Sequence, residues 1–229
     1  MAETNGRRAW LLAIDTATSR VVVAAGDPQG ALLGAMTTEA GHRHGERLLP
    51  MIGRLTGELN LRRSRIAAVI VGTGPGAFTG LRVGIATAKG LAHALGTPII
   101  GVSTGEALIE AASAAKNGRI ALLVPAGPSD RVLVRAGAAG VHLPGGTQPD
   151  LGQDETLVAV DLGGRAPEDA VTRGAEALDG LAAALVRIGA RRHAADDLDD
   201  LSRLVPDYVT LPRGVTSSSG EVAWLRDPR

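Results

Sequence analysis

A glycine-rich stretch at residues 71–84, VGTGPGAFTGLRVG, constrains the fold of this chain more than any other segment. It holds five glycines around one proline, follows the continuous apolar run IAAVIVG (66–72) and precedes a helical pattern over 79–95. A continuous apolar run of strand length is typical of a strand covered on both faces. We therefore expect a buried parallel strand, a tight loop and a crossover helix that leads into a further strand at 97–102.

The N-terminal part of the chain reads as a meander followed by a helix. Three apolar runs at 9–15, 20–27 and 31–40 are joined by the short turn formers TATS and PQG, which predicts antiparallel strands. A helical pattern follows at 44–61, although Pro50 predicts that its first turn is loose or that it begins later. The resulting β-β-β-α-β-α-β order is typical of a ribonuclease-H-like domain.

The second half repeats this order with weaker signals. We expect helices and strands at these positions: a linking helix at 103–115, strands at 119–127, 131–137, 140–143 and 156–162, a long helix at 167–190 and a short acidic helix at 195–204. Residues 144–154 read as a loop. We predict an α/β protein of two lobes with a cleft between them, the second lobe degenerate. The predicted divisions are 1–102 for the N-terminal lobe, 103–212 for the C-terminal lobe and 213–229 for a mobile tail.

Composition excludes several classes of function. The chain has no cysteine, which excludes disulfides and thiol chemistry and fits a reducing compartment. The start MAETNGRRAW has no apolar signal-peptide region, and no apolar run reaches the ~18 residues of a membrane helix, so we expect a cytoplasmic protein without membrane contact. Lys+Arg and Asp+Glu are both 24, so we expect no strong RNA binding by the chain alone.

The glycine stretch fits no phosphate-binding template fully. The Lys-Ser or Lys-Thr pair of the Walker form is missing, and in the dinucleotide form Pro75 removes an amide where the phosphate would sit. A general anion site at the helix N-terminus remains open. In the first turn, DTATS, no glycine follows the acid, so Asp15 either holds a cation or caps its own turn. The candidate nucleotide or phosphate residues are Asp15, Thr16, Gly76 and Thr79.

A second interpretation of the glycines is close packing. Gly80, Gly84 and Ala88 recur every four residues and form a ridge of small residues, against which another helix can approach closely. Gly84 inside a helix costs up to ~1 kcal/mol relative to alanine, and a packing gain would offset that cost. The sequence therefore favours a protein surface over a phosphate at this helix.

Polar candidates elsewhere form no convincing catalytic group. His42, His44 and Glu46 in GHRHGE could bind a metal, but no third ligand lies nearby in the sequence, so we expect no metal site. Ser103 and Thr104 start a helix and are capping candidates. The acidic cluster at 196–200 is interpreted as a solvated helix face. No catalytic residue is predicted.

Four segments resemble the bacterial TsaB (YeaZ) family: LLAIDTATS, HGERLLPMIGRL, VGTGPGAFTGLRVGIATAKGLAHALGTPIIGVST and the later VPDYV. The glycine stretch is the most specific of them, with Ala77 where the family motif G-P-G-S-F-T-G-L-R-x-G has serine. The resemblance covers roughly residues 11–110. In the second lobe the chain has PAGPSDRVLVRAG where the family has D-A-R-R-x-E-V-Y.

The resemblance implies an actin/Hsp70/sugar-kinase-like (ASKHA) fold of two ribonuclease-H-like lobes and a non-catalytic subunit. Its partner would be TsaD, which transfers a threonylcarbamoyl group to the adenosine beside the tRNA anticodon, and the ATPase TsaE would join them. TsaD carries two histidines four residues apart, which this chain lacks. The resemblance also implies pairing through the helices at 45–60 and 79–95, tRNA contact only through the complex, a homodimer when TsaD is absent, and no cofactor of its own, with ATP or ADP at the heterodimer boundary.

These observations leave a leading hypothesis and two alternatives. In the leading one, the chain is a scaffold whose helix pair packs against TsaD, with Gly84→Leu expected to block assembly and leave the monomer folded. The expected interface residues are Leu48, Ile52, Leu55, Gly80, Gly84, Ile85 and Ala88. The first alternative is an ASKHA-type ATPase or kinase acting on its own, with Asp15 at its metal. The second is a metallopeptidase that uses HRHGE.

Overall fold

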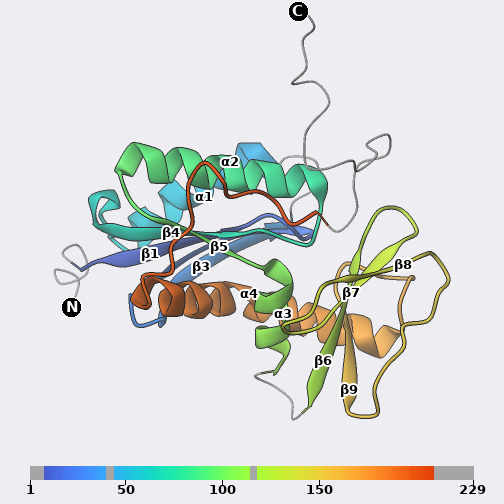
Figure 1. Ribbon diagram of the computed structural model, residues 1–229. Helices are drawn as coiled ribbons and strands as arrows, with labels where there is room; N and C mark the ends of the chain where they lie inside the picture. The colour runs from blue at the N-terminus through green and yellow to red at the C-terminus, as the bar shows by residue number, and fades with distance from the viewer. Residues whose placement is uncertain (1–7, 40–43, 114–117, 209–229) are drawn as a thin grey trace, which may run out of the picture.

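The computed structural model describes residues 8–39, 44–113 and 118–208, and the side chains of helix α1 from Arg47 onward (Figure 1). Within them the chain forms two β-sheets with helices between and above them. The strands of the first sheet are β1 (Trp10–Asp15), β2 (Arg20–Gly26), β3 (Leu32–Glu39), β4 (Ile66–Gly72) and β5 (Ile99–Val102). Their order is β3-β2-β1-β4-β5, with antiparallel pairing on the β3 side of β1 and parallel pairing on the β5 side.

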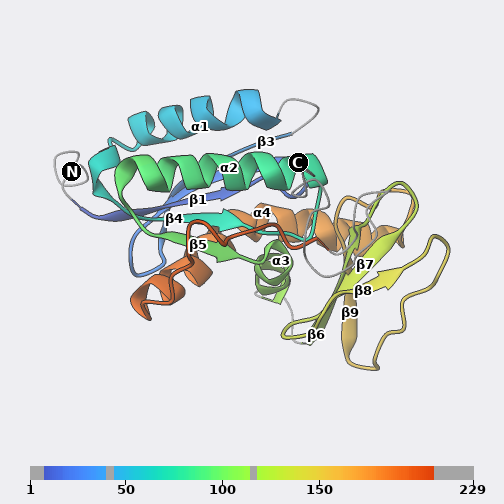
Figure 2. The same cartoon turned by 45° about the horizontal axis from the view of Figure 1, so that its top comes forward.

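Helices cover both faces of the first sheet (Figures 1 and 2). Helices α1 (His44–Glu58) and α2 (Phe78–Leu95) lie on one face, and α4 (Glu168–Ala194) lies on the other. Every residue of β1 is buried, because Leu12 and Ile14 face α1 and α2 whereas Leu11 and Ala13 face α4. This two-sided burial explains why β1 and β4 are continuous apolar runs in the sequence.

The second sheet repeats the pairing of the first with one helix fewer. Its strands are β6 (Arg119–Pro125), β7 (Arg131–Val134), β8 (Val141–Leu143) and β9 (Glu155–Ala159). The order β8-β7-β6-β9, with β9 parallel to β6, matches β3-β2-β1-β4. The helix that joins β3 to β4 in the first lobe is replaced by the loop 144–154. The predicted repeat of lobes and the degeneracy of the second are therefore confirmed.

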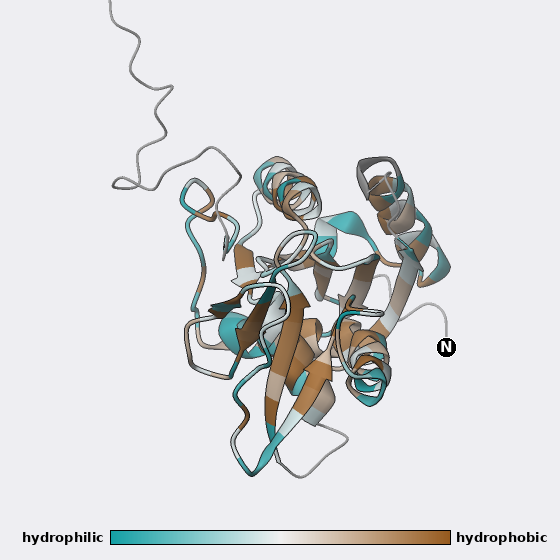
Figure 3. Ribbon diagram, turned by 90° about the vertical axis from the view of Figure 1, so that its right-hand side faces the viewer, coloured by the Kyte–Doolittle hydropathy of each residue, from teal (hydrophilic) through white to brown (hydrophobic). Residues whose placement is uncertain are grey.

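The long helix α4 joins the two sheets. Its apolar side packs on β9 and on helix α3 (Thr104–Ser113), and further along on the strands of the first sheet. Leu181, Ala184 and Leu185 are buried in this one core together with side chains from both sheets. Figure 3 shows the strands of the second lobe in brown, the colour of hydrophobic residues. The predicted division at residue 102 is not tested by this packing and stays a prediction.

The segment after α4 corrects one prediction. Residues 195–204 were expected to form a short helix, but they form turns that run back along the edge strand β5. Asp199 makes an isolated antiparallel bridge to Ile99, and the amide of Asp207 donates to the Thr73 carbonyl at 2.7 Å. The Asp200 carboxylate accepts from the Ser202 amide and hydroxyl, which favours a turn over a helix.

The acidic cluster is also not a solvated helix face. Asp199 Oδ2 accepts from the Gly101 amide at 2.7 Å and lies 3.1 Å from Arg192 Nη1, and Arg192 also donates to the Gly101 carbonyl. Asp197 binds the same guanidinium. Asp197 and Asp199 therefore hold the segment against α4 and β5, whereas the acids of a solvated helix face would point into water.

The other elements match the predictions within a few residues. Helix α1 begins at His44 and contains Pro50, so the helix does not start late. The predicted tail at 213–229 lies outside the described residues. No helix among the described residues is long and apolar enough to cross a membrane.

Asp199→Ala should loosen the returning segment, because it removes the acceptor of the Gly101 amide and a partner of Arg192. We expect a loss of about 1–3 kcal/mol in the free energy of unfolding and faster hydrogen exchange at the Gly101 amide. Asp200→Ala is the control, since its carboxylate binds only within its own turn. Equal exchange at Gly101 in both variants would contradict this account.

Candidate functional site

The two most distinctive loops of the sequence pack against each other. The turn after β1, residues 15–19, lies against the glycine stretch that connects β4 to α2. The Ala77 amide donates to the Ala17 carbonyl at 2.7 Å, and the Thr16 hydroxyl donates to the Gly80 carbonyl at 2.7 Å. We call these segments, residues 15–19 and 72–80, the loop junction. It joins the carboxyl ends of two parallel strands, where open α/β sheets bind ligands.

Asp15 lies at the centre of the loop junction and is fully buried. Its Oδ1 accepts from the Ala17 amide at 2.8 Å, so the predicted capping role is confirmed. Its Oδ2 accepts from the Thr104 hydroxyl at 2.6 Å, and that hydroxyl in turn accepts from the Gly74 amide at 3.1 Å. Burial raises the pKa of Asp15 to about 6, although both hydrogen bonds favour the charged form.

The glycines of the junction make room for the chain's own first turn. A Cβ at Gly72 would lie closer than 3.0 Å to the Asp15 carboxylate, and one at Gly76 equally close to the Ala17 carbonyl. A Cβ at Gly84, on α2, would meet the Thr16 hydroxyl in the same way. Real Cβ atoms essentially never approach this closely. These three positions are therefore explained by packing within one chain.

This packing leaves little of a phosphate cradle. The amides of Gly74 and Ala77 are donated to Thr104 and Ala17, and Pro75 has none. The structure brings together three of the four predicted phosphate residues, Asp15, Thr16 and Gly76, and leaves Thr79 exposed on the first turn of α2. An anion at the junction would have to compete with these internal hydrogen bonds.

The predicted interface residues face the interior of the protein and not the solvent, which the sequence had suggested they would face. On α1 they are buried in the core beneath α1 and α2, and on α2 they are buried against the first sheet and the turn at 15–19. They are Leu48, Ile52, Leu55, Gly80, Gly84, Ile85 and Ala88. They therefore offer no surface to a partner in this fold. The added side chain of Gly84→Leu would displace the Thr16 hydroxyl, so we expect this variant to destabilise the monomer itself as well as any assembly.

The outer faces of α1 and α2 carry a different set of small residues. On α2, Ala86, Gly90 and Ala94 are exposed and recur every four residues. On α1, Gly57 is exposed, and a Cβ at Gly57 or Gly90 would meet nothing within 4 Å. The two helices lie side by side (Figure 2). We call these residues the outer ridge. Sequence reasoning missed it because it has the same spacing as the buried ridge.

Larger apolar side chains are also exposed on the two helices. Leu49 is 56% exposed on α1, whereas Phe78 and Leu95, at the two ends of α2, are 36% and 39% exposed. The Arg82 guanidinium lies 3.7 Å from the centre of the Phe78 ring, and its Nε donates to the Tyr208 hydroxyl at 2.9 Å. Two of the chain's four aromatic residues thus meet at one exposed end of α2.

The lobes are joined beside the junction. The Ser19 amide and hydroxyl both donate to the Asp161 carboxylate, at 2.7 and 2.5 Å, and Arg20 pairs with Asp179 of α4 at 2.6 Å. These contacts connect the turn after β1 with the end of β9 and with α4. Local sequence patterns carry no signal for them, because each pair is more than a hundred residues apart.

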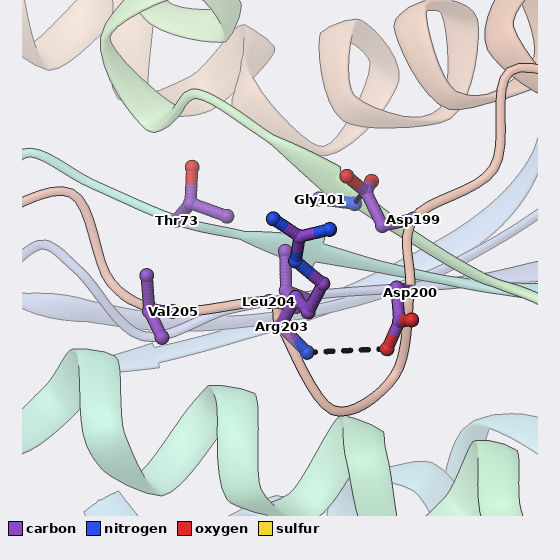
Figure 4. A pocket seen from close by; sticks show the side chains of 7 residues that line it. All are labelled: Thr73, Gly101, Asp199, Asp200, Arg203, Leu204 and Val205. Atoms are coloured by element: carbon purple, nitrogen blue, oxygen red, sulfur yellow. Dashed lines mark hydrogen bonds between the residues drawn. The ribbon is translucent and has the colours of Figure 1, made fainter.

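A hollow of about 320 Å³ lies where the returning segment passes the first sheet (Figure 4). It is lined by Thr73, Gly101, Asp199, Asp200, Arg203, Leu204 and Val205. In Figure 4 the Arg203 side chain extends toward Gly101 and Asp199, while its amide binds Asp200. The two carboxylates here already bind the chain itself, so they serve to hold the segment in place.

The metal hypothesis concerns residues that the structure describes only partly. His42 and the side chains of His44 and Glu46 lie outside the described residues. Among the side chains that are described, no three His, Cys, Asp or Glu come together as a metal site.

Ser103 acts as the predicted cap of α3, since its hydroxyl accepts from the Glu106 amide at 3.3 Å.

Comparisons with known proteins show which family the chain resembles. The family model described as TsaD, tRNA N6-adenosine threonylcarbamoyltransferase, matches residues 28–183. An uncharacterized protein of Mycobacterium leprae is 43% identical over 101 residues, which cover 43% of this chain and 28% of that protein. The tRNA threonylcarbamoyladenosine biosynthesis protein TsaB of Escherichia coli is 39% identical over 94 residues, 41% of this chain and 40% of TsaB. The chain spans less than half the length of these curated relatives.

A solved structure supports the fold over a longer stretch. YeaZ from Pseudomonas aeruginosa superposes with a TM-score of 0.70 at 24% identity, covering 88% of this chain and 100% of that one. The predicted two-lobed fold is therefore confirmed. Because the family model matches more than half of the chain, the protein belongs to that family, and its named relatives place it with the TsaB (YeaZ) proteins.

Gly84→Ala and Gly90→Ala form a matched pair on α2. A methyl group at Gly84 meets Thr16, so we expect a loss of about 1–3 kcal/mol in the free energy of unfolding. At Gly90 the space is open, so alanine should be neutral or stabilising by up to about 1 kcal/mol. Chemical denaturation measures both, and equal effects would contradict the orientation of α2.

The pKa of Asp15 gives a pH prediction. In the unfolded chain it titrates near 3.8, and in the folded protein near 6. Between these values the folded state binds more protons, so the free energy of unfolding falls as the pH rises, by about 2 kcal/mol between pH 4 and 6 and by about 3 kcal/mol over the whole transition. Asp15→Asn binds no proton there and should lack this fall. A difference between the two proteins that stays constant from pH 4 to 7 would contradict the raised pKa.

Proposed function

We propose that this protein is a non-catalytic scaffold subunit that pairs with TsaD in forming N6-threonylcarbamoyladenosine beside the anticodon of tRNAs. Its family and its TsaB relatives support the pathway. The observation that carries the proposal is the outer ridge: the helix pair α1–α2 presents small residues with open space above them, and exposed apolar side chains occur on the same two helices.

The outer ridge suits a helix–helix contact. Glycine and alanine at four-residue spacing let a partner helix approach closely, and ridges of this spacing pack into the grooves of a second helix. Leu49, Phe78 and Leu95 add exposed apolar area on the same two helices. Arginine and aromatic residues, as in the Arg82–Phe78–Tyr208 group, are enriched among the side chains that dominate binding energy at interfaces.

The loop junction supports a role without chemistry of its own. Both carboxylate oxygens of Asp15 accept hydrogen bonds from within the chain, and the carboxylate has no exposed surface. A catalytic acid or metal ligand has to reach substrate or metal with at least one of these oxygens. This geometry favours the scaffold over an ATPase or kinase that acts alone.

The further members of the assembly follow from the same proposal. TsaE is the expected third subunit, ATP or ADP would be held at the heterodimer boundary, and tRNA would be reached only through the complex. The last point agrees with a net charge of zero. Without TsaD, the outer ridge would serve a homodimer, because one self-complementary patch can form a two-fold interface. The proposed compartment is the cytoplasm.

Light scattering on a sizing column tests the pairing. The chain is run alone and then mixed with TsaD from the same organism, each with and without ATP. We expect a homodimer that exchanges into a one-to-one heterodimer. A monomer that ignores TsaD and binds ATP would refute the scaffold and favour the enzyme.

Gly90→Leu locates the contact on the outer ridge. The added side chain meets nothing in its own chain, so the monomer should stay folded while both assemblies weaken by at least tenfold. Ala175→Leu, on an exposed position of α4, is the matched control and should pair normally. Normal pairing of Gly90→Leu with TsaD would place the interface elsewhere.

A further inference from the structure

The outer face of the second sheet has a hollow that the loop junction and the outer ridge do not involve. In the first lobe both sheet faces are covered by helices, whereas here the loops 144–154 and 160–167 lie over the apolar side chains of the second sheet. The hollow measures about 240 Å³, roughly the volume of eight water molecules. It is lined by Leu123, Arg131, Gln148, Pro149, Leu157, Arg165, Ala166 and Pro167.

Two arginines line this hollow without any acidic neighbour. Arg131 is only 6% exposed, and its guanidinium donates to the backbone carbonyls of Arg165 and Thr147. Arg165 donates to the carbonyls of Gly127 and Pro128, at 3.0 and 2.9 Å. All of these acceptors are neutral. Among the described residues neither arginine has a carboxylate within 4.0 Å, and no acid lines the hollow.

Other arginines of the same lobe are paired with carboxylates. Arg135 pairs with Glu155 at 2.7 Å, and Arg173 pairs with Asp169 at 2.8 Å, although Arg173 and Arg135 are more exposed than Arg131. A buried cation is costly unless a negative charge accompanies it. Arg131, the most buried arginine among the described residues of this lobe, thus has no counter-charge, and neither does Arg165, whose backbone carbonyl accepts from it.

The chemistry of the hollow selects the kind of anion. Guanidinium groups bind carboxylates through two parallel hydrogen bonds, and each of these arginines has N–H groups beyond those given to the carbonyls. The remaining lining is apolar apart from Gln148, with Leu123 and Leu157 contributed by the sheet. Leu123 and Leu157 are buried, whereas Pro149, Ala166 and Pro167 are partly or fully exposed. An apolar chain attached to the anion would cover these three residues, whereas a free inorganic anion would leave them in water.

We propose that this hollow binds a small carboxylate with a short aliphatic chain, held by Arg131 and Arg165 through its charge and by Pro149, Ala166 and Pro167 through its chain. The site lies in the second lobe, on different elements from α1 and α2. It does not depend on the scaffold function proposed above, and each can fail without the other.

Methyl NMR titration of the full chain tests the proposal. With the leucine methyl groups labelled, butyrate, acetate and inorganic phosphate are added separately. We expect butyrate to shift the methyl signals of Leu123 and Leu157, which line the hollow, with a dissociation constant on the order of 1 mM, at least threefold tighter than acetate, because its chain covers the exposed apolar lining. Phosphate that binds as tightly as butyrate would overturn the assignment of a carboxylate.

Arginine variants test whether the positive charge is responsible for the binding of butyrate. Arg165→Gln should weaken butyrate at least fivefold, and Arg165→Lys, which keeps the charge and loses the paired donors, should weaken it less. Arg119→Gln, an exposed arginine at the start of β6 outside the hollow, should bind butyrate normally. The dispersion of the methyl signals of each variant tests whether that variant is folded. Unchanged binding by folded Arg165→Gln, or no shift at Leu123 and Leu157 with any probe, would overturn the proposal.

Discussion

The contact between the turn at 15–19 and the glycine stretch is the constraint on which the rest of the structure depends. It places β1, β4 and the start of α2 within hydrogen-bond distance of one another, and through Thr104 it also holds the start of α3. Side chains at Gly72, Gly76 or Gly84 would push these elements apart. The orientation of α2 follows from this contact, and with it the choice of which side of the helix faces outward.

That orientation connects the fold with the proposed function. A phosphate site would need free amides and space between the glycine loop and the first turn, whereas here the two segments hydrogen-bond to each other. Because α2 turns its buried glycines toward Thr16, its exposed small residues form the outer ridge. The phosphate-like glycine motif and the proposed protein-binding surface thus lie on two sides of one helix.

Among its described residues, the second lobe lacks a counterpart of helix α1, which joins β3 to β4 in the first lobe. Its strand order repeats that of the first lobe, but a loop replaces the helix between β8 and β9, so one sheet face is covered mainly by loops and by the first turn of α4. Loops enclose space less completely than a packed helix, and the hollow with Arg131 and Arg165 lies on this face. The first lobe, covered on both faces, has no comparable pair of arginines among its described core residues.

The sequence by itself determined the order and type of nearly all elements, because apolar periodicity, turn residues and capping are local properties. It also predicted that Asp15 caps its turn, which involves only Ala17 two residues away. It failed at 195–204, where bonds from Asp199 to Gly101 and Arg192 outweigh helical propensity. Only the tertiary structure decided which ridge of α2 is buried, because Gly80–Gly84–Ala88 and Ala86–Gly90–Ala94 share one spacing, and the contact with Thr16 distinguishes them.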